Sequence, residues 1–405
     1  MKACERLLKY VVVRTPSDDT SNTVPSSACQ FDLAKLLLQE LKELGVSDAT
    51  MDEKSFVFGK IPATPGYEHC PTIGFLAHMD TVSDFCDHTP VPVITENYNG
   101  EDLVLGESGR ILRVKEFPHL PSLKGRTLIT TDGTTILGAD DKAGIAEIMT
   151  AVERLLNNEI PHGPVHVAFT PDEEIGLGSH SFDVPRFAAD FAYTLDGGCE
   201  GEIQYENFNA CSAKFEIEGF SVHPGSSKDT MINASLLAME INNLLPNAET
   251  PRDTEGYEGF FHLCEMSGDV SHASMEYIVR DHDAASFEAR KNTLLHIEKI
   301  MNEKWGAGTV SLTLKDEYQN MSVIIQDVMH LIENAKQAAI TCGIEPIVEP
   351  IRGGTDGSYL SFHGLPCPNL GTGGYAFHGP YEHITVEGMD LATDMIMELI
   401  ALYAK

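Results

Sequence analysis

The hydrophobic pattern of the first half of the chain alternates between apolar runs and amphipathic segments. Residues 31–45, FDLAKLLLQELKELG, carry leucines at helical spacing and end in glycine, which predicts an amphipathic helix. Near-continuous apolar runs at 72–80, 165–171 and 191–198 are typical of strands buried on both faces. Residues 143–158 repeat apolar positions at helical spacing. Strands that alternate with helices predict a mostly parallel sheet with helices on both faces.

The pattern changes between residues 208 and 316. Segments in this region predict, in order, a strand, a helix, two strands, a helix and a strand; SAKFEIEG alternates with period two, for example, and SFEARKNTLLHIEKIMNEKW has helical spacing. This order is typical of a ferredoxin-like α+β sandwich. Helical patterns suited to the first part of the chain return at 328–343 and 387–405.

We therefore expect an α/β protein with two domains, as its length also suggests. A mixed, mostly parallel sheet with helices on both faces would form a discontinuous catalytic domain from residues 1–207 and 317–405. Residues 208–316 would form an inserted α+β ferredoxin-like domain. Such a domain exposes a sheet edge, and pairing of that edge with a second copy predicts a homodimer through the inserted domain.

The charge balance excludes some classes of partner. The 405 residues contain 28 Lys and Arg against 61 Asp and Glu, a net charge of −33. This charge repels nucleic acid and anionic membrane surfaces, so we expect neither as a partner. No apolar stretch approaches the roughly 18 residues of a spanning helix, and the early charges do not predict a secretory signal. The nine cysteines show no CxxC spacing, which favours a reduced, cytoplasmic protein without a thiolate metal site.

Acidic and imidazole side chains gather at the predicted carboxyl ends of the strands, where open α/β sheets bind ligands. They are His78, Asp140, Glu173, Glu174 and Asp196. Unit charges about 4 Å apart repel by about 4 kcal/mol at an effective dielectric constant near 20, so gathering several acids in one cleft is costly without a cation. Oxygen and imidazole ligands without a thiolate suit catalytic zinc, manganese or cobalt better than a structural zinc.

Each of these side chains, taken alone, also has an ordinary structural explanation. His78 and Asp80 project to the same side of a strand and can form a hydrogen-bonded pair, in which Asp80 orients the imidazole. Asp140 can cap the helix that follows it. Asp196 lies in TLDGG and can be a turn residue. The joint occurrence of these residues at strand ends is what favours a metal site.

A metal site of this kind needs a second histidine. Of the 16 histidines, His378 is best placed, in the glycine-rich segment GGYAFHGPYEHI before the last predicted helix, and His383 is the local alternative. The chain has no G-x-S-x-G motif of serine hydrolases, no H-E-x-x-H motif and no phosphate-binding G-x-x-x-x-G-K-[ST] motif.

Several long segments resemble one family. HMDT, LGADDKAGIAEIMTA, AFTPDEE, DGG, YENFNA, VHPG, EGYEGF, PIRGGTDGSYLSF and FHGPYE resemble, in order and spacing, the peptidase T family of cytoplasmic tripeptide aminopeptidases. These enzymes belong to the di-zinc exopeptidases, which also include aminoacylases and desuccinylases. The resemblance runs from about residue 60 to the last residue, and ENFNA, EGYEGF and RGGTDG carry the narrower assignment. It implies a di-zinc exopeptidase-like fold and a small peptide as substrate.

The resemblance also implies two zinc ions per subunit, for which manganese or cobalt can substitute. His378 is preferred to His383 because the family follows its ligand histidine with an acid four residues later, here Glu382. Relatives often carry a second histidine where this chain has Tyr381. The implied ligands are His78, Asp140 and Asp196 for one ion, and Asp140, Glu174 and His378 for the other.

The resemblance assigns the remaining polar residues to catalysis and substrate binding. Asp80 would orient a metal ligand, and Glu173 would be the general base for a metal-bridging hydroxide. His223 in VHPG is a candidate oxyanion donor, and Arg280 and Arg352 are candidates to bind the terminal carboxylate, although each arginine can equally form an intramolecular ion pair. We expect an aminopeptidase that hydrolyses the N-terminal bond of tripeptides; the alternative is a dipeptidase or an N-acyl amino acid deacylase on the same scaffold.

Overall fold

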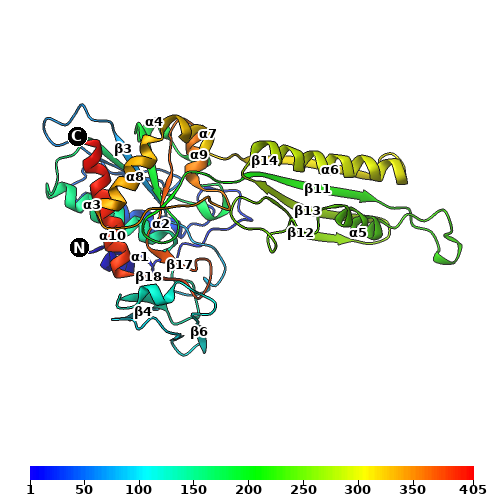
Figure 1. Ribbon diagram of the computed structural model, residues 1–405, viewed down its shortest axis with the longest axis horizontal. Helices are drawn as coiled ribbons and strands as arrows, with labels where there is room; N and C mark the ends of the chain where they lie inside the picture. The colour runs from blue at the N-terminus through cyan, green and yellow to red at the C-terminus, as the bar shows by residue number, and fades with distance from the viewer. The chain divides into compact units, whose positions relative to one another are not determined.

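The structure is a computed structural model that describes all residues from 1 to 405. The chain forms two compact units, shown in Figure 1. Unit 1 comprises Met1–Tyr205, Val323–Glu349 and Thr355–Lys405, and unit 2 comprises Glu206–Ser322 and Pro350–Gly354. Unit 2 extends beyond the expected 208–316 and includes the return segment 350–354, because Arg352 in that segment donates hydrogen bonds to carbonyl groups of residues 254–258.

Unit 1 is built on an eight-stranded mixed sheet. Its central strands are parallel neighbours, and every residue of β3 is buried, as its continuous apolar run predicts. Antiparallel pairs lie towards both edges. In spatial order the strands are β1 (Thr50–Met51), β2 (Val57–Ile61), β8 (Val165–Thr170), β3 (Ile73–His78), β9 (Phe191–Leu195), β16 (Asn369–Leu370), β10 (Glu202–Gln204) and β15 (Ile347–Val348).

Helices pack on both faces of this sheet, which confirms the predicted fold class. Helix α3 contacts β3 and β9, and α1 and α10 pack on α3. A separate hydrophobic cluster joins Leu76 of β3 to Phe187 of α4 and Leu360 of α9. The helices are α1 (Ala3–Tyr10), α2 (Gln30–Leu44), α3 (Ala139–Leu156), α4 (Val184–Phe187), α7 (Ser322–Ile325), α8 (His330–Thr341), α9 (Asp356–Phe362) and α10 (Val386–Tyr403).

A second, four-stranded sheet in unit 1 was not predicted from the sequence. Its spatial order is β17 (Gly374–Tyr375), β18 (His383–Thr385), β7 (Leu128–Thr131) and β4 (Pro92–Thr95), and the hairpin of β5 (Leu103–Leu105) and β6 (Arg110–Leu112) accompanies it. These strands have two to four residues, too few for a clear period-two pattern. Two of them also come from the other end of the chain, so their pairing is decided by tertiary contacts.

Unit 2 has the element order predicted from the sequence. Its four-stranded sheet is antiparallel throughout, with the order β12-β13-β11-β14. Both helices pack on one face, where Phe215, Met275 and Leu294 lie in the core. The elements are β11 (Asn209–Glu218), α5 (Ala234–Leu244), β12 (Phe260–Gly268), β13 (His272–Asp281), α6 (Ala284–Trp305) and β14 (Val310–Tyr318).

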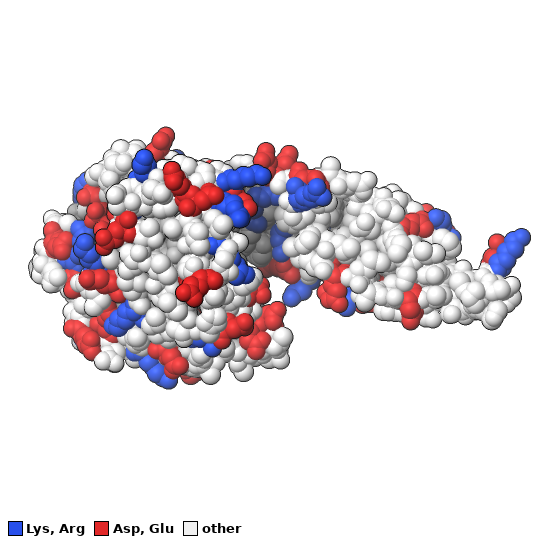
Figure 2. Space-filling view, turned by 90° about the horizontal axis from the view of Figure 1, so that it is seen from below, with Lys and Arg blue, Asp and Glu red and all other residues white.

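The surface agrees with the acidic composition. Figure 2 shows acidic side chains distributed over the visible face of each unit, with basic side chains interspersed among them. On the outer face of the unit 2 sheet, Lys214 forms ion pairs with Glu216 and Glu276, both at 3.1 Å. No helix of the structure is both long enough and apolar enough to traverse a bilayer.

Candidate active site

His78 ends strand β3 and lies between two carboxylates. Its Nε2 donates to Asp140 Oδ1 at 3.0 Å, and its Nδ1 lies 3.1 Å from the carbonyl oxygen and 3.4 Å from Oδ1 of Asp80. Burial by itself lowers the pKa of His78, but the carboxylates of Asp140 and Asp80 outweigh burial and raise this pKa well above its ordinary value. Asp80 therefore engages Nδ1 mainly through its backbone carbonyl, and its carboxylate lies beside the ring, where it can help to orient it.

Asp140 offers one carboxylate oxygen to each of two histidines. Oδ1 accepts from His78, and Oδ2 accepts from His378 Nε2 at 3.1 Å. Burial raises the pKa of Asp140, but the hydrogen bonds from His378 and His78 outweigh it and hold this pKa far below its ordinary value. The side chain of His378 is 53% exposed, so the site is open to solvent on this side.

Glu382 fixes the loop that carries Asp140. Its Oε2 accepts from the backbone N–H groups of Leu137 and Gly138, both at 2.7 Å, and its Oε1 accepts from Asp140 N at 3.0 Å. Burial raises the pKa of Glu382 to about 7 in spite of these donors. Because Glu382 follows His378 in the same loop, it ties the loops of the two candidate ligands together.

His383, the alternative to His378, is engaged elsewhere. Its Nδ1 donates to the carbonyl oxygen of Tyr381 at 2.7 Å, and its Nε2 accepts from His119 Nε2 at 2.8 Å. The ring also stacks on His119 and Tyr375. Its two ring nitrogens are thus occupied outside the acidic cluster, whereas His378 lies within it.

The adjacent residues Glu173 and Glu174 both face the site. They lie in the short 3-10 helix η2 (Glu173–Ile175), which follows β8 after Asp172 adopts a left-handed φ of 59°. Their backbone N–H groups donate to Oδ1 and Oδ2 of Asp80, at 3.0 and 3.1 Å. Glu174 Oε2 also accepts from His378 Nε2 at 3.1 Å. A strand would have directed the two side chains to opposite faces, so the bend after the strand is what brings them together.

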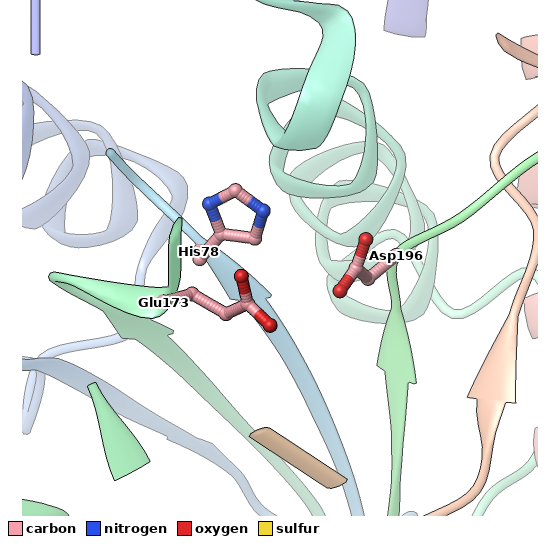
Figure 3. A group of neighbouring side chains, drawn as sticks. All are labelled: His78, Glu173 and Asp196. Atoms are coloured by element: carbon pink, nitrogen blue, oxygen red, sulfur yellow. The ribbon is translucent and has the colours of Figure 1, made fainter. Parts of the chain in front are cut away.

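The structure contains two groups of side chains suited to a metal ion. In each group the candidate ligand atoms lie within 4.8 Å of one another. Figure 3 shows the first group, in which the carboxylate of Glu173 points towards that of Asp196 and the ring of His78 lies beside them. The two groups are His78, Glu173 and Asp196, and His78, Asp140 and Glu174.

The electrostatics of the cluster fit divalent cations. Burial and the charge of Asp140 raise the pKa of Asp196 to about 7, and burial and Asp196 raise the pKa of Glu173 well above its ordinary value. Oε1 of Glu174 and Oδ1 of Asp141 are buried without a hydrogen-bond partner. These two buried oxygens lack hydrogen-bond donors, and the raised pKa values of Asp196 and Glu173 reflect a shortage of neighbouring positive charge. A divalent cation that binds oxygen and imidazole would compensate for both.

The substrate-binding candidates His223, Arg280 and Arg352 belong to unit 2, whereas the metal-ligand candidates belong to unit 1. His223 is exposed, and its Nδ1 accepts from Gly225 N at 3.1 Å, which leaves the proton of the neutral ring on Nε2. Arg280 is 9% exposed and lies 3.3 Å from Glu317 Oε2.

Arg352 is the most extensively bonded of the three. Its Nη1 donates to the carbonyl oxygens of Gly256 and Glu258, and its Nη2 donates to the carbonyl and hydroxyl oxygens of Thr254. Arg280 thus forms the intramolecular ion pair that was the alternative explanation for it. Arg352 instead bonds neutral oxygens of its own unit and pairs with no carboxylate.

Sequence reasoning did not identify the contacts that fix the site. It gave Asp80 one partner, His78, but Asp80 also binds the backbone of both glutamates. It used Glu382 only to choose between two histidines, and it left out Asp356. The carboxylate of Asp356 contacts Thr170 and Ser179, on either side of the loop 171–178 that carries Glu173 and Glu174. The acid in RGGTDG was the available signal, but its partners lie about 180 residues away in the sequence.

Known proteins match both the sequence and the fold. Residues 137–402 match the model of peptidase family M20/M25/M40. The "Peptidase T" of Caldanaerobacter subterraneus subsp. tengcongensis is 53% identical over 406 residues, which cover 100% of this chain and 99% of that protein.

Solved structures share the fold. The aminopeptidase PepT of Bacillus cereus has a TM-score of 0.79 and 24% identity, with 100% of this chain and 98% of that chain covered. A tripeptidase of Staphylococcus aureus has a TM-score of 0.78 and 20% identity, with the same coverage. On the family match and the full-length identity, the chain belongs to peptidase family M20/M25/M40 and is one of its peptidase T members.

Proposed function

We propose that this peptidase is a metal-dependent aminopeptidase that releases the N-terminal residue of tripeptides. The observation that carries the proposal is the position of Asp140, with one oxygen on His78 and the other on His378. A carboxylate that bridges two imidazoles in this way is suited to bridging two cations. The likeness to peptidase T proteins over the whole chain supports the choice of substrate.

Two zinc ions, with manganese or cobalt as alternatives, are the cations that this ligand set fits. When bound, such cations polarise the scissile carbonyl and lower the pKa of water to near 7. Three carboxylates and two imidazoles would hold them, without a thiolate. We assign His78, Asp140 and Asp196 to one ion, and Asp140, Glu174 and His378 to the other. Glu173, which lies with His78 and Asp196 in the first group of side chains, is kept in this proposal for proton transfer.

Glu173 is the residue we assign as general base. Its neighbour Glu174 accepts a hydrogen bond from His378, whereas no histidine lies within 4.0 Å of the Glu173 carboxylate as an ion-pair partner. Glu173 is therefore available to accept a proton from the attacking water and to pass it to the leaving amine. Asp80 holds Glu173 through its backbone and orients His78, which is why we count Asp80 among the catalytic group.

We assign unit 1 as the catalytic domain and unit 2 as a lid and dimerisation domain.

The Nε2–H tautomer of His223 is suited to donate to the oxyanion that forms at the scissile carbonyl. We keep Arg280 and Arg352 as the candidates for the terminal carboxylate, since a guanidinium can bind a carboxylate through two parallel hydrogen bonds. The edge strands β12 and β14 each pair with a single neighbour, which leaves two sheet edges at which a homodimer could form. All nine cysteines are free, which supports a cytoplasmic location.

Glu173→Gln tests the central assignment. We expect turnover of a tripeptide to fall by at least about 100-fold, as typical for loss of a general base, while the metal content stays that of the wild type. Glu53→Gln, at an exposed glutamate of unit 1, is the matched control and should retain wild-type turnover. Full activity in Glu173→Gln would refute the assignment.

A substrate panel tests the reaction class. Free tripeptides should be hydrolysed at the N-terminal bond, and a chelator should abolish this activity until zinc, manganese or cobalt is restored. Hydrolysis of N-acetylated amino acids without hydrolysis of tripeptides would instead assign the protein as an N-acyl deacylase, and a preference for dipeptides would assign it as a dipeptidase.

A further inference from the structure

The carboxylate of Asp356 joins the two ends of the glutamate loop, residues 171–178. Its Oδ2 accepts from the hydroxyl of Thr170, and its Oδ1 accepts from the backbone N–H of Ser179, both at 3.0 Å. Thr170 is the last residue of β8, and Ser179 is the first residue after the loop. One buried side chain from a distant helix thus connects the residue before the loop to the residue after it.

Asp356 is itself held in a fixed position at the start of α9. The preceding residue, Thr355, caps this helix, and its hydroxyl accepts from Gly357 N at 3.4 Å. A Cβ atom at Gly357 would lie 2.3 Å from the carbonyl oxygen of Cys367, so the start of the helix packs closely on the backbone of the segment around Cys367. The motif RGGTDG therefore places a carboxylate where it can act as a rigid anchor.

The interior of the glutamate loop is already compact. The N–H groups of Leu177 and Gly178 both donate to the carbonyl oxygen of Asp172, at 3.0 and 2.9 Å. A Cβ atom at Gly178 would lie 2.4 Å from the carbonyl oxygen of Pro171, which shows how closely the loop ends approach each other. Because the loop is compact, its orientation depends on the few residues that anchor it: Asp80 and the partners of Asp172 hold its interior, and Asp356 holds its ends.

We propose that Asp356 is a positioning residue for Glu173, acting through Thr170 and Ser179. The proposal rests on the assignment of Glu173 as general base. Both oxygens of Asp356 are engaged by the loop ends, and Asp356 is in neither candidate metal group. It lines the same small cavity as Glu173, and a displacement of a catalytic group by about 1 Å can cost about 100-fold in rate.

Two substitutions separate positioning from other roles. Asp356→Ala removes both hydrogen bonds, whereas Asp356→Asn can keep both, because its amide oxygen accepts from Ser179 and its amide N–H donates to the hydroxyl of Thr170. We expect Asp356→Ala to lower kcat about 100-fold with KM within about threefold of wild type, and Asp356→Asn to lower kcat by no more than about fivefold. If Asp356→Ala does not fold, Thr170→Val removes one of the two hydrogen bonds at constant shape and should give an intermediate loss of kcat.

Hydrogen exchange of the metal-free protein gives a readout that does not depend on activity. The backbone amides of residues 172–179 should exchange faster in Asp356→Ala than in wild type, and at the wild-type rate in Asp356→Asn. Asp269→Ala is the matched control, because Asp269 in unit 2 also accepts two backbone hydrogen bonds, from Ser271 and His272. It should change neither the exchange of the loop nor kcat.

Wild-type kcat or unchanged loop exchange in Asp356→Ala would overturn the proposal, as would equal losses in Asp356→Ala and Asp356→Asn. An active Glu173→Gln variant would overturn the assignment of the base instead. The exchange rate measures the restraint on the loop whatever Glu173 does, so the two failures are distinguishable.

Discussion

Replacing Asp80 by asparagine should disturb the glutamate loop without changing the size of the side chain. The two oxygens of Asp80 accept from the backbone N–H groups of Glu173 and Glu174, at 3.0 and 3.1 Å. An amide has only one acceptor oxygen, so its NH2 group would face one of these donors. Rotating the amide changes which donor is unpaired but does not remove the conflict, because both partners are donors.

The magnitude follows from the loss of one charge-assisted hydrogen bond at a buried group. Such bonds contribute about 1.5–3 kcal/mol. If the native position of the loop is required for turnover, this cost appears in the barrier, where each 1.36 kcal/mol is tenfold in rate. We therefore expect kcat/KM of Asp80→Asn to be about 10- to 150-fold below wild type.

Asp172→Asn is the matched control, because Asp172 anchors the other side of the same loop. Its oxygens accept from Ser26 N at 2.7 Å, from the hydroxyl of Ser26 and from Gln30 Nε2 at 2.6 Å. Two of these partners can reverse: the hydroxyl of Ser26 can accept, and Oε1 of Gln30 is buried without a partner and can take an N–H after the amide rotates. We expect its kcat/KM to stay within about threefold of wild type, or about 0.6 kcal/mol.

The assay is steady-state hydrolysis of a tripeptide by metal-loaded enzymes, with the metal content of each variant measured. Equal losses in Asp80→Asn and Asp172→Asn would refute the reasoning, because only the first substitution leaves a backbone donor unpaired. A loss of less than about threefold in Asp80→Asn would refute it as well.

Two further predictions concern stability. Gly144→Ala should lower the free energy of unfolding by about 1–3 kcal/mol, since its Cβ would lie 2.2 Å from the Leu195 carbonyl oxygen. Urea unfolding measures this, and Gly353→Ala, with no atom within 4 Å of its Cβ, should match wild type; equal midpoints for the two variants would contradict the steric argument. Burial lowers the pKa of His383 to about 4, so between pH 6.5 and pH 4 this imidazole is protonated in the unfolded chain but neutral in the folded protein. Stability present above pH 6.5 should therefore be lost as the pH falls towards 4, and His383→Phe should flatten this part of the pH dependence of the urea midpoint. If the urea midpoint of His383→Phe falls with pH as steeply as that of wild type, His383 is not the cause of this pH dependence.

The long periodic elements could be predicted from the sequence because their signal is local. The run at 31–45 corresponds to α2, which ends at Leu44 with Gly45 in the left-handed conformation. The order of elements in unit 2 could likewise be predicted from the sequence, since each of its long strands and helices has at least nine residues. The sheet formed by β4, β7, β17 and β18 was not, because its strands are short and pair across distant parts of the chain.

For the site, the candidate residues could be identified from the sequence: acids and histidines at the ends of buried strands, and two glutamates after a proline. They follow from residue type and position, which are local properties of each segment. Their hydrogen-bond partners, in contrast, are set by tertiary packing. Asp80 meets the backbone of Glu173, and Asp356 meets Thr170, because the fold brings separate strands and helices to one edge of the sheet. A carboxylate accepts from any donor within reach, so its partner is decided by the packing of the chain around it and not by its neighbours in sequence.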